Sequence, residues 1–138
     1  MSFLGFGRIT QAALKRLVSF GVKIAIYVTS KPSKPIWEDC YDLIRHSMHG
    51  LTITIEVSHS IDQSSSKSDV AIVECALTPS TKRLVNAEFV NTMEKISVIE
   101  NIARSPAVDI VALLEALDQG KIFDTGLDIF EDEPTILN

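Results

Sequence analysis

The first 28 residues place two short apolar segments on either side of a glycine turn and an amphipathic segment. Ser2 to Leu4 predicts a short strand, and Arg8 to Phe20 predicts a helix that Gly21 ends. Val22 to Val28 is nearly all apolar, which is typical of a strand covered on both faces. The apolar stripe expected on the helix consists of Ile9, Ala12, Ala13, Leu17 and Phe20. This order predicts a βαβ unit, and such a unit requires a parallel sheet.

The same alternation continues along the rest of the chain. Further strands are expected at Leu51 to Val57, Asp69 to Cys75, Ile96 to Ile99 and Thr125 to Phe130. Further helices are expected at Ile36 to Met48, at Asn86 to Met93 with Asn86 as cap, and at Asp109 to Asp118 with Asp109 as cap. The serine-rich run from Ser58 to Ser68 predicts a loop or a frayed helical turn. We therefore predict one α/β domain over residues 1–138, a doubly wound parallel sheet of the Rossmann type.

The turn after the first strand reads G-x-G-x-x-T, with Gly5, Gly7 and Thr10 at its spaced positions. In a dinucleotide-binding turn, the first glycine permits the bend and the second lets the backbone approach a pyrophosphate. The third glycine allows close packing of the helix on the strand, and here Thr10 replaces it. We expect phosphate binding with reduced affinity; the alternative is a helix that serves packing alone.

Composition excludes several classes of partner. A net charge of −5 argues against nucleic acid and anionic membranes, and no apolar run reaches the roughly 20 residues of a membrane span. Without a secretion signal, Cys40 and Cys75 are expected to stay reduced in the cytoplasm. His46 and His49 could share a metal with Cys40 or Asp42, but no second cluster completes such a site. No metal site is therefore expected, and His59 lies apart in the serine-rich run.

Four segments carry a resemblance that covers nearly the whole chain: "GFGRITQA", "CALTPSTKRLVN", "NIARSPAVD" and "GKIFDTGLDIFEDEP". Their order and spacing resemble the nucleotide-binding domain of the D-isomer-specific 2-hydroxyacid dehydrogenases, most closely the glyoxylate/hydroxypyruvate reductase branch. The resemblance implies an oxidoreductase that transfers hydride between NADPH and a 2-keto acid. Family enzymes also have a substrate-binding domain, which these 138 residues lack, so we expect a truncated domain.

The resemblance implies a set of cofactor contacts. It places the amides of Arg8 and Ile9, at the start of a helix, against the pyrophosphate. The region where NAD-preferring sites carry an acid reads Thr29, Ser30, Lys31, which suits the 2′-phosphate of NADP; the alternative is an ordinary basic loop. The full set of expected contacts is Gly5, Gly7, Arg8, Ile9, Thr29, Ser30, Lys31, Thr81, Ile102 and Asp128, although the sequence around Thr81 also favours a plain turn.

The family's catalytic residues are an arginine, a glutamate and a histidine. Arg104 matches the arginine that binds the substrate carboxylate, and Glu133 matches the glutamate that pairs with the histidine. The histidine segment has no match in these residues, so we expect no activity from this chain alone.

Two other interpretations stay open. The chain could be an interaction module that pairs with itself or with a full-length relative, or a fragment of a longer active enzyme.

Two acidic residues depart from the family pattern. Glu100 brings a charge into a strand expected to be buried, and Asp124 is expected in the core, where an unpaired carboxylate is costly.

Overall fold

The structure, a computed structural model, describes residues 1–17, 20–21, 24–27, 55–58 and 60–130. The strands are β1 Ser2–Leu4, β2 Ile24–Tyr27, β3 Ile55–Ser58, β4 Val70–Val73, β5 Val98–Asn101 and β6 Asp124–Leu127. The helices are α1 Arg8–Leu17, α3 Ile61–Ser65, α4 Ala87–Thr92 and α5 Ile110–Asp118, with a 3-10 turn at Ser105–Ala107. The helix expected at Ile36 to Met48 lies outside the described residues. Strands and helices otherwise alternate as predicted.

All strand pairs in the described part of the chain are parallel, and they form one sheet in the order β3-β2-β1-β4-β5-β6. Leu4, at the end of β1, is in register with Tyr27 on one side and Val73 on the other. The chain thus builds outward from β1 in both directions, and the strand order reverses between β1 and β4. The predicted doubly wound parallel sheet is confirmed, and in such sheets ligands bind outside the carboxyl ends of the strands at this reversal.

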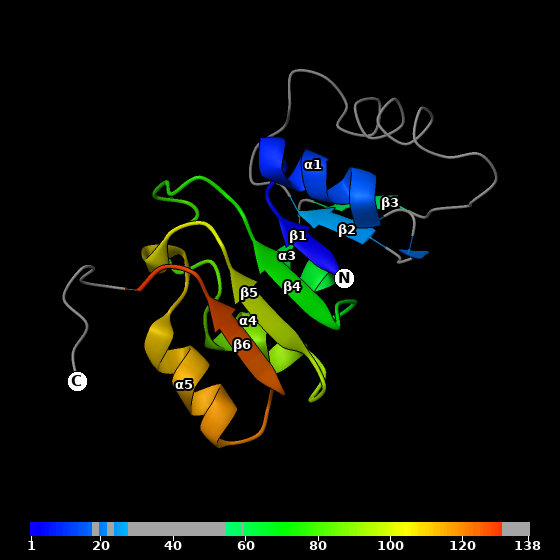
Figure 1. The fold of residues 1–138 in the computed structure, drawn as a ribbon. Helices are drawn as coiled ribbons and strands as arrows, with labels where there is room; N and C mark the ends of the chain where they lie inside the picture. Colours follow the sequence, from blue (N-terminus) through cyan, green and yellow to red (C-terminus); the bar gives the residue numbers. More distant parts are fainter. Residues whose placement is uncertain (18–19, 22–23, 28–54, 59, 131–138) are drawn as a thin grey trace.

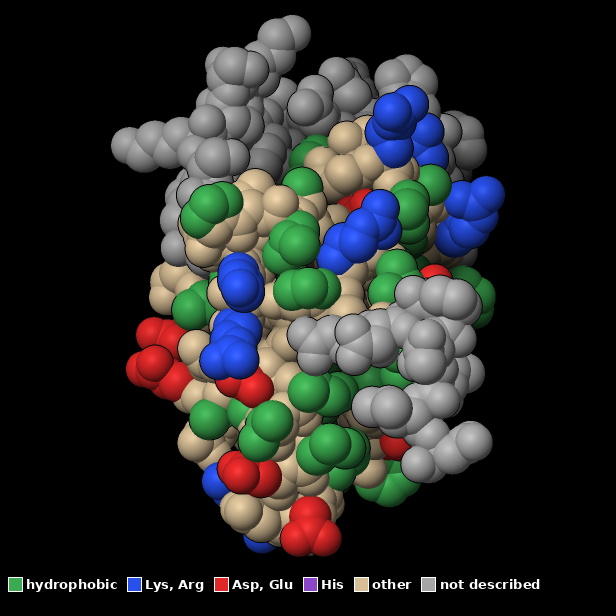
Figure 2. Space-filling view, turned by 90° about the vertical axis from the view of Figure 1, so that its left-hand side faces the viewer, with side chains coloured by type: hydrophobic (Ala, Val, Ile, Leu, Met, Phe, Trp, Pro, Cys, Tyr) green, Lys and Arg blue, Asp and Glu red, His purple; other side chains and the backbone are tan. Residues whose placement is uncertain are grey.

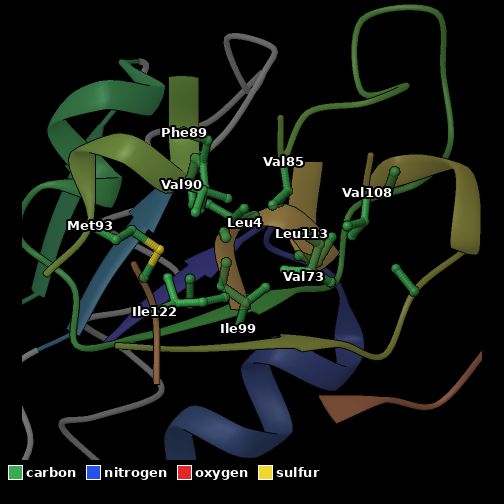
Figure 3. Packing of buried hydrophobic residues seen from close by; sticks show 14 residues of the cluster. Leu4, Val73, Val85, Phe89, Val90, Met93, Ile99, Val108, Leu113 and Ile122 are labelled. Carbon is green, nitrogen blue, oxygen red and sulfur yellow. The ribbon is translucent and has the colours of Figure 1, made fainter. Parts of the chain in front are cut away.

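The main apolar cluster lies on the face of the sheet opposite α1 (Figure 3). Val73 and Ile99 of the strands meet Phe89 of α4 and Leu113 of α5, and all four side chains are buried. Both helices start at the predicted caps. The Asn86 side chain accepts a hydrogen bond from the Phe89 amide at 3.0 Å, and the Asp109 side chain accepts one from the Ala112 amide at 3.4 Å. These caps satisfy amides that have no partner inside the helix.

The predicted apolar stripe of α1 is wrong in part. Ala13 and Leu17 are half-buried, but Ile9, Ala12 and Phe20 are exposed, and the buried residues of this helix are Thr10 and Leu14. The Thr10 hydroxyl donates to the Glu74 carboxylate and reaches the Gly5 carbonyl, so a polar residue is accommodated on the face that packs against the sheet. Periodicity alone could not identify that face, since it counts only apolar residues.

Two other expectations change. Asp124 begins β6 on the surface, and its side chain accepts a hydrogen bond from the Thr125 amide at 2.8 Å, so the expected buried carboxylate is absent from this position. Glu100 is half-buried and lies across Gly126 of β6, where the missing side chain leaves it room. The serine-rich run forms α3, capped by Ser60, and the buried Ser65 hydroxyl bonds with Thr92 of α4.

The turn between β1 and α1 depends on Gly5. Its φ is +124°, a conformation that L side chains rarely adopt. A β-carbon at this position would lie 2.9 Å from the Glu74 carbonyl oxygen and 3.0 Å from Cys75 Cα. The turn therefore touches the backbone that leaves β4, and neither side can yield because both are main chain.

Gly5→Ala is expected to lower the free energy of unfolding by about 2–4 kcal/mol, because it adds both backbone strain and a clash with the main chain. Gly21→Ala is the matched control: Gly21 also has a positive φ, of +68°, but no atom of the described residues lies within 4 Å of its added β-carbon. Its loss is expected to be about 1 kcal/mol. Urea unfolding followed by circular dichroism measures both; equal losses would contradict the importance of the close approach.

Candidate functional site

A hollow of about 540 Å³ opens at the carboxyl ends of β1, β4 and β5. Its walls come from the start of α1, from the segment after β4 and from the segment after β5. The lining residues are Gly7, Ile9, Glu74, Cys75, Ala76, Leu77, Ile102, Ala103 and Arg104. Figure 2 looks onto the side toward which the strands point in Figure 1, and Lys and Arg side chains gather over its upper half. The hollow thus lies where the sheet topology predicts a ligand, and it joins Gly7, Ile9 and Ile102 of the predicted set with Arg104.

The amino end of α1 supplies hydrogen-bond donors to this hollow. The first bond of the helix runs from the Gln11 amide to the Gly7 carbonyl at 3.0 Å, so the preceding amides have no partner inside the helix. Within the described residues, nothing accepts a hydrogen bond from the amides of Arg8 and Ile9. Free amides at the positive end of a helix attract anions. The two amides predicted to face a pyrophosphate are therefore available.

Glu74, which sequence reasoning did not identify, lies on the other donors of this turn. Its Oε2 accepts hydrogen bonds from the Gly7 and Thr10 amides, both at 3.3 Å, and from the Thr10 hydroxyl. That hydroxyl also reaches the Gly5 carbonyl at 3.4 Å. The buried Thr10 is thus accommodated by polar partners on the sheet side. A signal existed in the sequence: an acid directly follows an apolar strand, at the edge where the glycine turn was expected.

Thr81 closes the loop that follows β4. Its side chain is 2% exposed, and its hydroxyl donates to the Ala76 carbonyl at 2.6 Å and accepts from the Thr78 amide at 2.7 Å. This residue therefore shapes the wall that carries Ala76 and Leu77. Its direct contact with a cofactor stays a prediction.

The segment after β5 is held by Asn101, a second residue that sequence reasoning missed. Its buried amide side chain accepts from the Ala103 amide at 3.1 Å and donates to the Arg104 carbonyl at 3.2 Å. Arg104 itself is exposed at the hollow, and its Nη1 donates to the Ala103 carbonyl at 2.8 Å. Asp128 follows β6 on the surface, and its amide donates to the Asn101 carbonyl at 3.1 Å. Asn101 thus connects the two segments that carry Arg104 and Asp128.

Cys75 lies half-buried in the wall beside Glu74. Burial raises the pKa of the Cys75 thiol above its ordinary value, and the negative charge of Glu74 adds to this effect. The thiol is therefore protonated at neutral pH and serves as an apolar part of the wall.

Several predicted residues lie outside the described part of the chain: Thr29, Ser30, Lys31, Glu133, Cys40 and the three histidines. Among the residues that the structure does describe, no group of three or more His, Cys, Asp or Glu could hold a metal ion. The described helices are also too short or too polar for any of them to cross a membrane.

Known proteins provide the family context. Residues 1–138 match the family model described as D-isomer specific 2-hydroxyacid dehydrogenase, NAD binding domain. A glyoxylate reductase from Thermococcus kodakarensis is 34% identical over 134 residues, which are 97% of this chain and 36% of that protein. A human glyoxylate reductase/hydroxypyruvate reductase is 33% identical over 138 residues, which are 100% of this chain and 38% of that protein.

The fold has the same relatives. The crystal structure of an NADPH-dependent glyoxylate/hydroxypyruvate reductase from Sinorhizobium meliloti, in complex with NADP and malonate, aligns with a TM-score of 0.77 at 31% identity. The match covers 99% of this chain and 37% of that structure. The chain thus spans between about a third and two fifths of the length of these relatives. With its parallel sheet, glycine turn and matched family model, the chain belongs to the D-isomer-specific 2-hydroxyacid dehydrogenase family, as an NAD(P)-binding domain.

Proposed function

We propose that this chain binds NADPH in preference to NADH and forms the cofactor-binding part of a 2-keto acid reductase. The observation that carries the proposal is the hollow itself: Ile9, whose amide has no acceptor among the described residues, lines one wall, and Arg104 lines another. A dinucleotide needs an anion site and a flat apolar wall at such an edge. The Ile9 amide at the start of α1 supports the proposed anion site, and Leu77 and Ile102, which line the same hollow with partly exposed side chains, support the proposed apolar wall.

The preference for NADPH rests on the sequence after β2. Thr29, Ser30 and Lys31 supply hydroxyls and a positive charge, and the stretch from Tyr27 to Lys31 contains no acid to bind a ribose 2′-hydroxyl. A 2′-phosphate favours such donors because it carries negative charge and several acceptor oxygens. The bound dinucleotide would supply the hydride.

Arg104 is proposed to bind the carboxylate of the keto acid. Its guanidinium is exposed at the hollow, and a guanidinium can bind a carboxylate through two parallel charge-assisted bonds. Glu133 is proposed to pair with the catalytic histidine of the family, whose segment has no match in these 138 residues. We therefore propose that this polypeptide by itself binds cofactor without turning over substrate, in the cytoplasm, and that glyoxylate or hydroxypyruvate is the substrate of the complete assembly.

Titration of the purified chain with NADPH, followed by nucleotide fluorescence, is expected to saturate with a Kd at or below about a millimolar, a value typical of weak specific sites. NADH is expected to bind more weakly. The same samples should not oxidise NADPH above a blank when glyoxylate or hydroxypyruvate is added. Tighter binding of NADH would contradict the role given to Ser30 and Lys31, and measurable turnover would contradict the need for a further general acid.

Cys75 offers a local probe of the same site. Because its raised pKa keeps the thiol protonated, iodoacetamide at pH 8 should label it more slowly than an exposed thiol, and urea should remove this protection. Saturating NADPH should slow the labelling further, since Cys75 lines the hollow. Peptide mapping by mass spectrometry separates Cys75 from Cys40. If NADPH binds to the sample but leaves the rate of Cys75 labelling unchanged, the cofactor does not bind in this hollow.

A second candidate function is association with another copy or with a full-length relative. Val111 and Leu114 lie three residues apart on α5, and their side chains are 61% and 58% exposed. Residues at this spacing share one helix face, so they form an apolar surface that a second chain could cover.

Light scattering after size-exclusion chromatography is expected to give twice the mass of one chain. Leu114→Glu should shift the protein toward the monomer by placing a charge in the contact. Lys82→Glu, at an exposed position in the loop after β4, is the control. A monomeric wild-type protein at high concentration would count against this candidate.

A further inference from the structure

We propose that Glu74 is an internal competitor for the cofactor's pyrophosphate: its carboxylate occupies part of the anion site at the start of α1, so the dinucleotide binds only when this side chain moves away. This inference deepens the proposed function and rests on it, because it concerns the same hollow. It assigns Glu74 as a residue that limits cofactor affinity. It also predicts that the dinucleotide binds more tightly when the Glu74 side chain is removed.

The main chain holds Glu74 at this place. Its amide donates to the Leu4 carbonyl at 3.0 Å, which continues the pairing of β4 with β1. Its carbonyl oxygen lies against Gly5, at 2.9 Å from where a β-carbon would be. The side chain therefore starts from a fixed point next to the turn, and only rotations of its own bonds can take the carboxylate out of the site.

The carboxylate fills the space that Gly7 leaves open. A β-carbon on Gly7 would meet Glu74 Oε1 at 2.8 Å and Oε2 at 3.1 Å. The second glycine of such a turn is there so that a pyrophosphate can approach the backbone. In this chain the Glu74 carboxylate lies against the Gly7 backbone instead, and its Oε2 accepts hydrogen bonds from the Gly7 and Thr10 amides.

Charge makes the two occupants exclude each other. A carboxylate accepts hydrogen bonds and carries negative charge, as a pyrophosphate does, so the two compete for neighbouring donors at the start of α1 and repel each other at contact distance. The amides of Arg8 and Ile9 stay free in the described structure, so part of the anion site is intact. The competition therefore weakens cofactor binding without removing the surface to which it binds.

Thr10 completes the arrangement. A glycine at this position would offer the carboxylate one amide, whereas Thr10 offers its amide and its hydroxyl. The buried hydroxyl has no access to bulk water, so its bond to Glu74 also satisfies a polar group inside the protein. Thr10 in place of glycine and the acidic Glu74 thus both strengthen the same contact, the one between α1 and the Glu74 carboxylate.

The test compares NADPH binding by the wild-type chain with binding by Glu74→Gln, which removes the charge, and Glu74→Ala, which empties the site. We expect Kd to fall roughly tenfold or more, because juxtaposed like charges strongly disfavour a complex. Glu115→Gln is the matched control: it removes the same charge from an exposed position on α5 and should leave Kd unchanged. Thr10→Val, which keeps the shape but loses the hydroxyl, should tighten binding in the wild type and have no further effect in Glu74→Ala.

Inorganic pyrophosphate provides a second readout that does not depend on the nucleotide. In ¹H–¹⁵N spectra, it should shift the amide signals of Arg8 and Ile9 at lower concentration in Glu74→Ala than in the wild type. If NADPH binds the wild type and both Glu74 variants equally, the inference is overturned while the proposed function stands.

If no folded variant binds NADPH, the proposed function fails, and pyrophosphate alone decides the inference. A shift confined to the Glu74 variants supports it, and shifts that are equal or absent throughout overturn it. Should the Glu74 variants not fold, Thr10→Val decides the outcome, since unchanged pyrophosphate binding in that variant contradicts the competition.

Discussion

The close approach of the β1 turn to the chain leaving β4 is the constraint on which the rest of the structure depends. It joins the two halves of the sheet at the point where the strand order reverses. Gly5 makes it physically possible, because any β-carbon there would meet the backbone of Glu74 and Cys75. The same approach brings the end of β4 next to the start of α1. Fold and site therefore share one contact, and a change that opens it would affect stability and binding together.

Elements with strong local signals could be predicted from the sequence. The caps Asn86 and Asp109 carry side chains whose short reach fixes the start of a helix, and the strands are apolar runs between turn residues. A parallel sheet then follows from the alternation, and its reversal fixes where a ligand can bind. Such features need only residues near one another in the chain, or a rule of topology.

Features that depend on pairing across the sheet could not be predicted. Glu74 and Thr10 are 64 residues apart, and although an acid after an apolar strand places Glu74 at the right edge of the sheet, the local sequence does not identify Thr10 as its partner. The stripe of α1 was misassigned for the same reason, because Thr10 is buried by a distant polar partner. Glu100 and Gly126 are likewise matched through strand register, which places a charge where a glycine leaves room. Asn101, which holds the Arg104 segment, reads in the sequence as one more strand-end residue.

The first amides of a helix that starts beside a ligand site have no acceptor inside the helix. If no side chain accepts from them, these donors are unsatisfied in the empty protein. If a side chain accepts from them, the empty protein is stabilised by on the order of 1 kcal/mol and the ligand must displace that side chain. In this chain the Glu74 carboxylate accepts from the Gly7 and Thr10 amides, whereas the amides of Arg8 and Ile9 have no acceptor among the described residues. On the proposed function, binding of the dinucleotide includes an exchange of one anion for another at the Gly7 and Thr10 amides, so this part of its free energy is the difference between two similar contacts. A departure from the glycine pattern would then weaken binding by stabilising the empty protein as well as by steric crowding.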